Sequence, residues 1–299
     1  MPRIAILDDY LNVVLRSADW SQLPDDCQVE VFNEPIPADQ AAQKLGNFEI
    51  VVATRERMAF PDAILERLPK LKYLVTTGMN NRAIDLEACR KRGITVSGTP
   101  SSSGSTLELS WALILGLVKH IPLADATMHS GGWQAKEGET IWGKTFGILG
   151  LGKIGTASIP IAKAFGMKII AWSPNLTPER CAAAGVGYAD RETFFKTSDV
   201  ITMHMVLSDK TRGLVGAREF AWMKPTAYFV NTSRGPLVDE KALVEALKSG
   251  RIGGAGLDVY DQEPLPKDNP LRQQKNALLT GHMGYYTADN SRIVYPAAV

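Results

Sequence analysis

Three ionisable side chains with complementary chemistry follow predicted strands in the second half of the chain. Arg234 lies in NTSRGPLVDE (231–240), Glu263 in GLDVYDQEP (256–264) and His282 in LTGHMG (279–284). In an open parallel sheet the carboxyl ends of the strands share one edge, and ligands bind there. A fixed cation, a carboxylate and a titratable imidazole would then meet at one edge, which is the set that reduction of a 2-oxo acid needs.

Each of these side chains has a distinct part in such a reduction. Arg234 would hold a substrate carboxylate and polarise the adjacent carbonyl, because guanidinium stays charged and makes bidentate contacts. His282, as imidazolium, would donate a proton to the carbonyl oxygen while a nicotinamide cofactor supplies hydride. Glu263 beside the imidazole would favour its charged form and fix its tautomer. Taken singly, such residues are more often surface or ion-pairing groups, so only their joint arrangement indicates a reaction.

A hydride donor needs a site, and GILGLGKIG at 147–155 has the pattern of one. Gly150, Gly152 and Gly155 form GxGxxG between a predicted strand and a predicted helix, the setting of a dinucleotide-binding loop. The first glycine permits the tight turn, the second the approach of pyrophosphate, and the third close packing of helix on strand. The amides of Lys153 and Ile154 would face the pyrophosphate at the helix start.

The choice of dinucleotide depends on the residues at the end of the next strand. The fingerprint expects an acidic residue about 20 positions on, where it binds the ribose 2′-hydroxyl. Here the strand KIIAW ends in Ser173, with Asn175, Thr177 and Arg180 in the subsequent loop. Serine removes the carboxylate that would repel a 2′-phosphate, although no arginine stands immediately beside it. The sequence therefore predicts NAD or NADP and leaves the choice open.

The elements that must position these residues form two series. Short β-branched runs alternate with segments of helical period between residues 3 and 98, and again from residue 145. This alternation indicates βαβ units and parallel sheets. A Gly/Pro/Ser-rich link at 98–105 precedes an apolar helix, and 299 residues suffice for two domains. We predict an α/β fold of two doubly wound domains, of which only the second has the glycines for a dinucleotide.

Composition excludes several other classes of function. The 33 Lys and Arg residues balance 32 Asp and Glu residues, which argues against a nucleic-acid or membrane partner held by bulk charge. Cys27, Cys89 and Cys181 lie far apart, so neither a disulfide framework nor a metal site is predicted. No apolar run has membrane-spanning length and no signal peptide is evident. We expect a cytoplasmic protein without nucleic acid, membrane or metal.

At the level of whole motifs, the chain resembles the D-isomer-specific 2-hydroxyacid dehydrogenases, the family of phosphoglycerate, D-lactate and hydroxypyruvate/glyoxylate enzymes. The matching segments fall within about residues 71–286 and are TTGMNNRAIDLEACRKRGITVSGTP, GILGLGKIG, DVITMHMVLSDKTRGLV, MKPTAYFVNTSRGPLVDEKAL, GGAGLDVYDQEPL and LLTGHMGY. The resemblance implies a Rossmann dinucleotide-binding domain at 99–283 and a flavodoxin-like substrate domain at 1–98 plus 284–299. It also implies interconversion of an (R)-2-hydroxy acid and its 2-oxo acid by a homodimer.

The resemblance carries over residue by residue. It places Arg234, Glu263 and His282 at the family's catalytic positions and brings Asp258 toward the nicotinamide carboxamide. The residues that would line the cofactor cleft are Met205, Val206, Thr211 and Thr232. Those whose backbone amides would hold the substrate carboxylate, in the loop TGMNN, are Gly78, Met79 and Asn80.

Departures and alternatives remain. The family usually has proline where Val206 and Gly281 stand, and its C-terminal helix continues well beyond ADNSRIVYPAAV. Two further polar residues at strand ends have ordinary interpretations: His204 as a hydrogen-bonded structural histidine, and Arg55 as a solvated or ion-paired side chain. A non-catalytic, dinucleotide-sensing interaction protein, similar to the C-terminal-binding proteins that share the fold and the triad, is the alternative function.

Overall fold

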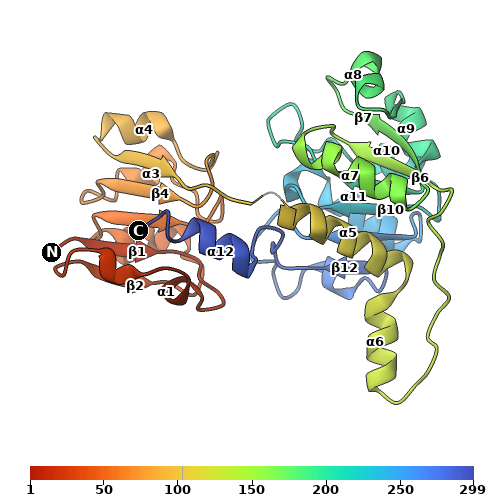
Figure 1. Cartoon of the computed structure of the whole chain (residues 1–299). Coiled ribbons are helices and arrows are strands. Elements are labelled where there is room, and N and C mark those ends of the chain that lie inside the picture. Colours follow the sequence, from red (N-terminus) through yellow and green to blue (C-terminus); the bar gives the residue numbers. More distant parts are fainter. Residues whose placement is uncertain (103) are drawn as a thin grey trace. The chain divides into compact units, whose positions relative to one another are not determined.

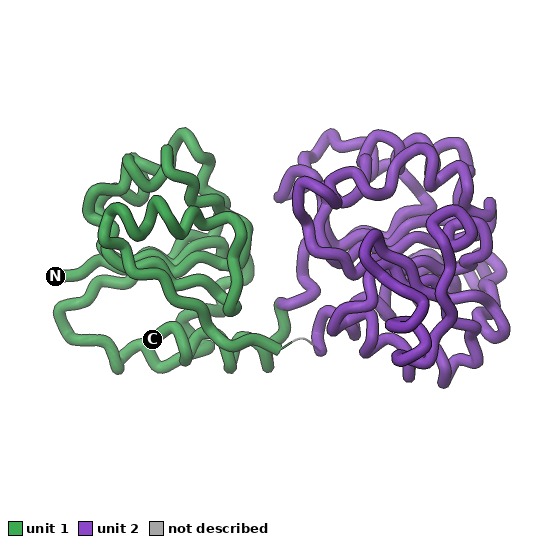
Figure 2. The backbone as a smooth tube through the Cα atoms, turned by 90° about the horizontal axis from the view of Figure 1, so that it is seen from above, with its two compact units in different colours: residues 1–102, 286–299 green, residues 103–285 purple. Residues whose placement is uncertain are grey.

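The computed structural model describes residues 1–102 and 104–299. The chain divides into two compact units, residues 1–102 with 286–299 and residues 103–285 (Figure 2). Each unit contains one sheet, and every strand pairing in the described residues is parallel. The predicted α/β fold class is thus confirmed, whereas the assignment of one unit to substrate and the other to cofactor stays a prediction.

The first unit has a five-stranded sheet in the order β2-β1-β3-β4-β5, which is the flavodoxin-like order (Figure 1). Its strands are β1 Arg3–Ile6, β2 Gln28–Val31, β3 Ile50–Ala53, β4 Tyr73–Thr76 and β5 Thr95–Gly98. Its helices are α1 Val14–Ser17, α2 Ala41–Leu45, α3 Asp62–Leu65, α4 Leu86–Lys91 and α12 Ala288–Val294, with single 3₁₀ turns at Trp20–Gln22 and Ala38–Gln40.

Alternate residues of these strands enter two apolar clusters, one on each face of the sheet. Val51 packs with Leu45 and Phe60 on one face, and its neighbour Val52 packs with Ile6 on the other. The end of the chain completes the second cluster, because Val294 and Tyr295 are buried there. Ser102 N–H donates to Asn290 Oδ1 at 2.7 Å, which ties the end of this unit's long segment to α12.

The second unit has a seven-stranded sheet in the order β12-β11-β10-β9-β6-β7-β8, a Rossmann-type arrangement extended by one strand. Its strands are β6 Thr145–Leu149, β7 Lys168–Trp172, β8 Gly187–Tyr188, β9 Val200–Met203, β10 Tyr228–Asn231, β11 Gly254–Leu257 and β12 Ala277–Leu279. Its helices are α5 Gly104–Val118, α6 Ile121–His129, α7 Lys153–Ala164, α8 Pro178–Ala183, α9 Arg191–Thr197, α10 Ala217–Trp222 and α11 Glu240–Lys248, with 3₁₀ turns at Gly235–Leu237 and Pro270–Gln273.

The apolar helix after the link, α5, packs into the core of this second unit. Trp111 stacks on Phe146 with ring centroids 5.1 Å apart and on Phe165 at 5.4 Å. Close approach to the sheet requires Gly256, since a Cβ there would lie 3.1 Å from Leu113 Cβ. Helix α6 differs, because none of its side chains, all within the described residues, is buried, and Figure 1 shows it extending away from the sheet.

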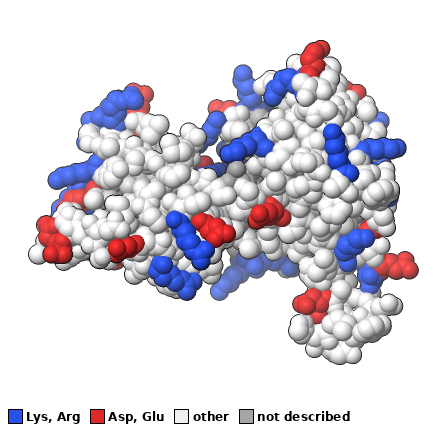
Figure 3. Space-filling view, in the orientation of Figure 1, with Lys and Arg blue, Asp and Glu red and all other residues white. Residues whose placement is uncertain are grey.

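Two surface properties bear on the expected partners. On the face shown in Figure 3, Lys and Arg are interspersed with Asp and Glu. Among the described helices, none by itself is long and apolar enough to cross a membrane; α5 and α6 meet that test only when joined, and they are bent by 65° at their junction. The expected cytoplasmic location stays a prediction.

Candidate active site

The glycine loop of the second unit has three glycines in three different surroundings. A Cβ on Gly150, whose φ is +102°, would lie 2.6 Å from the carbonyl oxygen of His204, and a Cβ on Gly155 would overlap the carbonyl oxygen of Gly150. A Cβ on Gly152 would meet no described heavy atom within 4 Å. Gly150 and Gly155 are therefore required by the fold, whereas the space beside Gly152 is open to a ligand.

Helix α7 begins at this open glycine. Gly152 is its N-cap, and no side chain within the described residues caps it. Lys153 and Ile154 start the first turn, whose amides lack partners within a helix and lie at the positive end of the helix dipole. The space at Gly152 and these amides fit a pyrophosphate. Pro160 lies within α7, which nevertheless runs unbroken from Lys153 to Ala164.

Ser173 lies at the same edge of the sheet as the glycine loop. Strand β7 pairs with β6 so that Trp172 lies opposite Leu149, and Gly150 N–H donates to Trp172 O at 3.0 Å. Ser173 comes next, half-buried, and Asn175, Thr177 and Arg180 are exposed. The Thr177 hydroxyl accepts from Arg180 N–H at 3.4 Å and hydrogen-bonds Glu179, which lowers the pKa of that carboxyl.

The other expected cofactor contacts lie after β9 and β10. Met205 Sδ would be 2.8 Å from a Cβ on Gly150, and Val206 is 61% exposed. The Thr211 hydroxyl is within hydrogen-bonding distance of Val206 O, at 2.8 Å. The Thr232 hydroxyl lies 2.8 Å from Ser110 Oγ. All four flank the edge that carries the glycine loop, and both threonine hydroxyls have partners inside the protein.

His204, which lies beneath Gly150, is structural in its contacts. Its Nε2 lies 3.0 Å from Thr202 Oγ1, whereas its Nδ1 is enclosed with no partner in the described structure. Burial lowers the pKa of His204 to about 4, so the imidazole is neutral near pH 7. This agrees with the expectation of a structural histidine.

Arg234 is held by a buried asparagine at the end of β10. Asn231 accepts from Ser233 N–H at 2.9 Å and donates to Arg234 O at 2.9 Å. The Arg234 guanidinium donates to Ser233 O at 2.6 Å, and the side chain is half-buried. Gly235 is next, and a Cβ there would overlap the Tyr260 carbonyl and lie 2.5 Å from Asp261 N. This glycine lets the Arg234 loop pack directly on the loop that leads to Glu263.

Glu263 and His282 form a close pair. Glu263 Oε2 lies 2.5 Å from His282 Nδ1, and Glu263 Oε1 accepts from Tyr260 N–H at 2.9 Å. A carboxylate on Nδ1 makes that nitrogen the donor, which leaves Nε2 for exchange of a proton with a ligand. The side chains are 14% exposed for His282 and 25% for Glu263, so the pair is shielded but reachable. His282 has φ +53°, a left-handed backbone conformation that is uncommon outside glycine.

Asp258, expected near the nicotinamide, makes its contacts with the loop that carries His282. Its Oδ1 accepts from Thr280 Oγ1 at 2.6 Å and from Met283 N–H at 2.8 Å, and its Oδ2 accepts from Gly284 N–H at 2.9 Å. The side chain is buried. Any contact with a cofactor would be additional to these three bonds.

The loop expected to bind the substrate carboxylate belongs to the first unit. Gly78 has φ +99°, and its N–H donates to Thr99 Oγ1 at 3.0 Å. Met79 and Asn80 are exposed. The amide of Gly78 is thus engaged within the protein, so the amides of Met79 and Asn80 are the remaining candidates for binding the substrate carboxylate. Arg55, at φ +53°, donates to Thr77 O at 3.3 Å and lies 3.9 Å from Glu56, in line with the ion-paired interpretation.

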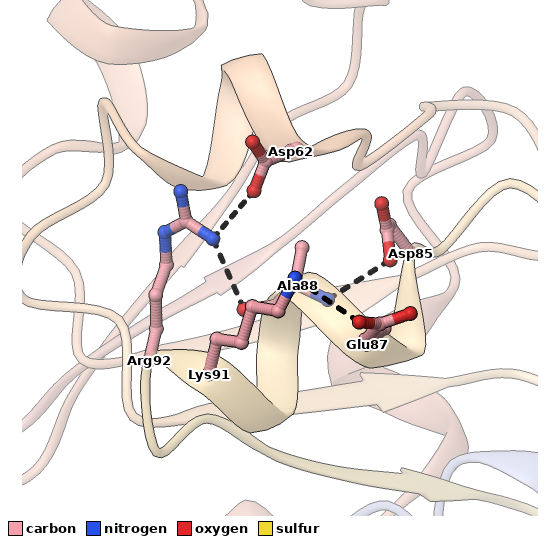
Figure 4. Close-up of a pocket in the computed structure, with 6 residues that line it drawn as sticks. All are labelled: Asp62, Asp85, Glu87, Ala88, Lys91 and Arg92. Atoms are coloured by element: carbon pink, nitrogen blue, oxygen red, sulfur yellow. Dashed lines mark hydrogen bonds and ion pairs between the residues drawn. The ribbon is translucent and has the colours of Figure 1, made fainter.

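A surface pocket elsewhere in the first unit is lined by charged residues that mostly pair with one another. It is lined by Asp62 of α3, by Glu87, Ala88 and Lys91 of α4, and by Asp85 and Arg92, which cap the two ends of α4 (Figure 4). Arg92 pairs with Asp62 at 2.7 Å and Lys91 with Glu87 at 3.0 Å, while Asp85 caps α4. Throughout the described residues, no group of three or more His, Cys, Asp or Glu side chains could hold a metal ion.

Comparison with known proteins assigns the second unit to a known family. Residues 111–284 match the family described as D-isomer specific 2-hydroxyacid dehydrogenase, NAD binding domain. The chain belongs to this D-2-hydroxyacid dehydrogenase family, and its second unit contains the family's NAD-binding domain.

Individual relatives extend the likeness to both units. The chain is 42% identical to the glyoxylate reductase of Thermococcus litoralis, over 75% of this chain and 70% of that one. It is 39% identical to the D-3-phosphoglycerate dehydrogenase of Methanocaldococcus jannaschii over 84% of this chain, but spans only 48% of that longer protein. A phosphoglycerate oxidoreductase structure from Vibrio cholerae superposes with a TM-score of 0.93 at 37% identity, covering 100% of this chain and 96% of that one.

Proposed function

We propose that the protein is an NAD(P)-dependent dehydrogenase that interconverts an (R)-2-hydroxy acid and its 2-oxo acid. The observation that carries this proposal is the 2.5 Å contact between Glu263 and His282, on the edge of an NAD-binding domain that also presents Arg234. The relatives named above are dehydrogenases and reductases, so the non-catalytic alternative is not favoured. The R configuration is inferred from the family.

The residues divide the work of reduction among them. Arg234 binds the substrate carboxylate and draws electron density from the neighbouring carbonyl. When bound, a reduced nicotinamide would supply the hydride that the carbonyl carbon accepts. His282 gives its Nε2 proton to the carbonyl oxygen, which becomes the hydroxyl, and Glu263 stabilises the cationic ring before transfer. In oxidation the same nitrogen takes the proton back. The amides of Met79 and Asn80 are our candidates for a second hold on the substrate carboxylate.

Turnover of 2-oxo acids by the purified chain tests the proposal. Glyoxylate, hydroxypyruvate, pyruvate and phenylpyruvate are each assayed with NADH and with NADPH. We expect at least one pair to turn over, and Arg234→Ala to abolish turnover while cofactor still binds. Arg251→Ala, a change at another arginine of the same unit, is the control and should leave turnover intact. Folded protein that binds cofactor but reduces none of the four would refute the dehydrogenase and favour the sensor.

The cofactor itself is NAD or NADP, and we propose that Ser173 lets the site accept a 2′-phosphate. The support is the neutral side chain at the end of β7, together with the exposed donors Asn175, Thr177 and Arg180 in the next loop. A Ser173→Asp variant should bind NADH as before and lose NADPH, since a carboxylate repels the 2′-phosphate. Wild-type protein that already excludes NADPH would show that Ser173 does not set the preference.

We further propose that the protein is a homodimer and that α6 lies in the interface. No residue of α6 is buried, and Ile121, Leu123 and Met128, all within the described chain, are about half exposed. Trp133, just beyond the helix, is 76% exposed. Exposed large apolar side chains gathered on one projecting element are typical of an association surface, and a second copy of the chain is the partner that the family predicts.

A further inference from the structure

The carboxylate of Asp258 closes the loop that presents His282. Oδ1 alone accepts two hydrogen bonds, one from the Thr280 hydroxyl at 2.6 Å and one from the Met283 amide at 2.8 Å. These donors stand on either side of the dipeptide Gly281-His282. A single oxygen atom thus holds both ends of a two-residue span whose second residue is the proposed acid.

That span needs an external hold. His282 has φ +53°, and a left-handed non-glycine residue persists only when its surroundings impose it. Gly281 precedes it, has no heavy atom of the described residues near its missing Cβ, and adds backbone freedom. Neither residue would keep the imidazole in place by itself.

Thr280 is the point at which the first end of the span is fixed. Its N–H donates to Leu257 O at 2.9 Å, its carbonyl accepts from the Tyr260 hydroxyl at 2.8 Å, and its own hydroxyl donates to Asp258. Burial together with the negative charges of Asp258 and Glu263 raises the pKa of Tyr260 well above its usual value, so that phenol remains a donor. The bonds that depend on the Thr280 side chain are those of its hydroxyl: the short one to Asp258 Oδ1, at 2.6 Å, and a longer one to Leu257 O, at 3.4 Å.

We propose that Thr280 is a positioning residue: its hydroxyl, through Asp258, sets the backbone that aims His282 at Glu263. Thr280 touches neither substrate nor cofactor in this role. The proposal rests on the dehydrogenase function, because the geometry it protects is that of the proton donor. It also gives Asp258 a function that does not require contact with the nicotinamide.

A Thr280→Val variant removes the hydroxyl and keeps the branched shape. Loss of one hydrogen bond to a charged group is expected to lower kcat about tenfold. Looser pairing with Glu263 favours the charged imidazole less, so the alkaline limb of the reductase pH–rate profile should move to lower pH. Cofactor Kd and substrate KM should change little. Thr280→Ser, which restores the hydroxyl, should return both kcat and the pH profile toward wild type.

A matched control is available in the same unit. The Thr193 hydroxyl donates to Asp190 Oδ2, also at 2.6 Å, at the start of α9. Thr193→Val deletes the same kind of bond between the same residue types, away from His282. We expect unchanged kcat and an unchanged pH profile. If both valine variants lower kcat equally while the pH profile stays fixed, the effect is general loosening and the proposal is wrong.

A second readout does not depend on turnover. A charge-assisted hydrogen bond between Glu263 and His282 should give a downfield proton resonance in the ¹H NMR spectrum, absent in Glu263→Gln. Thr280→Val should broaden or shift this resonance, and Thr280→Ser should restore it. An unaltered resonance in a folded Thr280→Val protein overturns the proposal. If wild type shows the resonance but reduces no 2-oxo acid, the dehydrogenase proposal fails, while this comparison still decides the role of Thr280.

Discussion

Replacing Gly152 by alanine should separate cofactor binding from folding. Its φ of −94° suits any residue, and a Cβ would meet no described atom within 4 Å. The free energy of unfolding should therefore change by less than about 0.5 kcal/mol. If a pyrophosphate lies against this glycine, however, the methyl group displaces it from the amides of Lys153 and Ile154. Hydrogen bonds to charged groups contribute about 1.5–3 kcal/mol each.

Loss of one such bond corresponds to a roughly tenfold to hundredfold rise in the Kd of the cofactor. Gly155→Ala is the matched contrast, because its Cβ would overlap the Gly150 carbonyl and lie 2.9 Å from Ile148 Cγ2. That variant should lose about 1–3 kcal/mol of stability. Kd is measured by titration calorimetry with NADH and NADPH, and stability by urea unfolding. A Gly152→Ala protein that is stable and binds both cofactors as tightly as wild type would refute this placement of the pyrophosphate.

Two further outcomes are expected from other parts of the second unit. The pKa of His204 falls from 6.5 to about 4 on folding, so as the pH is lowered His204 is protonated in the unfolded chain before it is protonated in the folded protein. The free energy of unfolding should therefore drop by at most about 3 kcal/mol as pH falls from 6.5 to 4. Urea midpoints measured across that pH range should fall less in His204→Asn than in wild type. If the two proteins lose stability in parallel, the role given to His204 is wrong. Leu123→Asp on α6 should convert a dimer to a monomer in light scattering after gel filtration, whereas Leu15→Asp, at a similarly exposed site of the first unit, should not. A Leu123→Asp protein that is still dimeric would remove α6 from the interface.

Much of the fold could be predicted because its signals are local. Strands such as RIAI and IVVA are short and mostly buried runs, and Gly150, Gly152 and Gly155 form a pattern within a single short segment. Strand β8 could not be predicted: Gly187–Tyr188 is two residues long, both exposed, and owes its conformation to pairing with β7. No periodicity exists in two residues, so only the neighbouring strand determines this element.

The triad residues could be placed at one edge, but their supports could not be predicted. Gly235 and Thr280 act through contacts with residues on other loops, and a pattern along one segment contains no information about such contacts. Asn231 instead bonds Ser233 and Arg234 of its own segment. The segment TSRGP does contain a signal, since a glycine directly after the proposed substrate-binding arginine indicates a close approach. The structure identifies the approaching group as the Tyr260 carbonyl.

The contacts of Asp258 change the interpretation of its motif in the same way. By resemblance, Asp258 in GLDVY faces the nicotinamide, yet its two oxygens already accept three donors from residues 280–284. A buried carboxylate is stable only when it is hydrogen-bonded, so these donors are required whether or not a cofactor is present. The loop that carries His282 is therefore shaped before any ligand binds. Because catalytic donors work best when their orientation costs nothing at the moment of reaction, we infer that Asp258 contributes first by holding this loop and only secondarily by any contact with the cofactor.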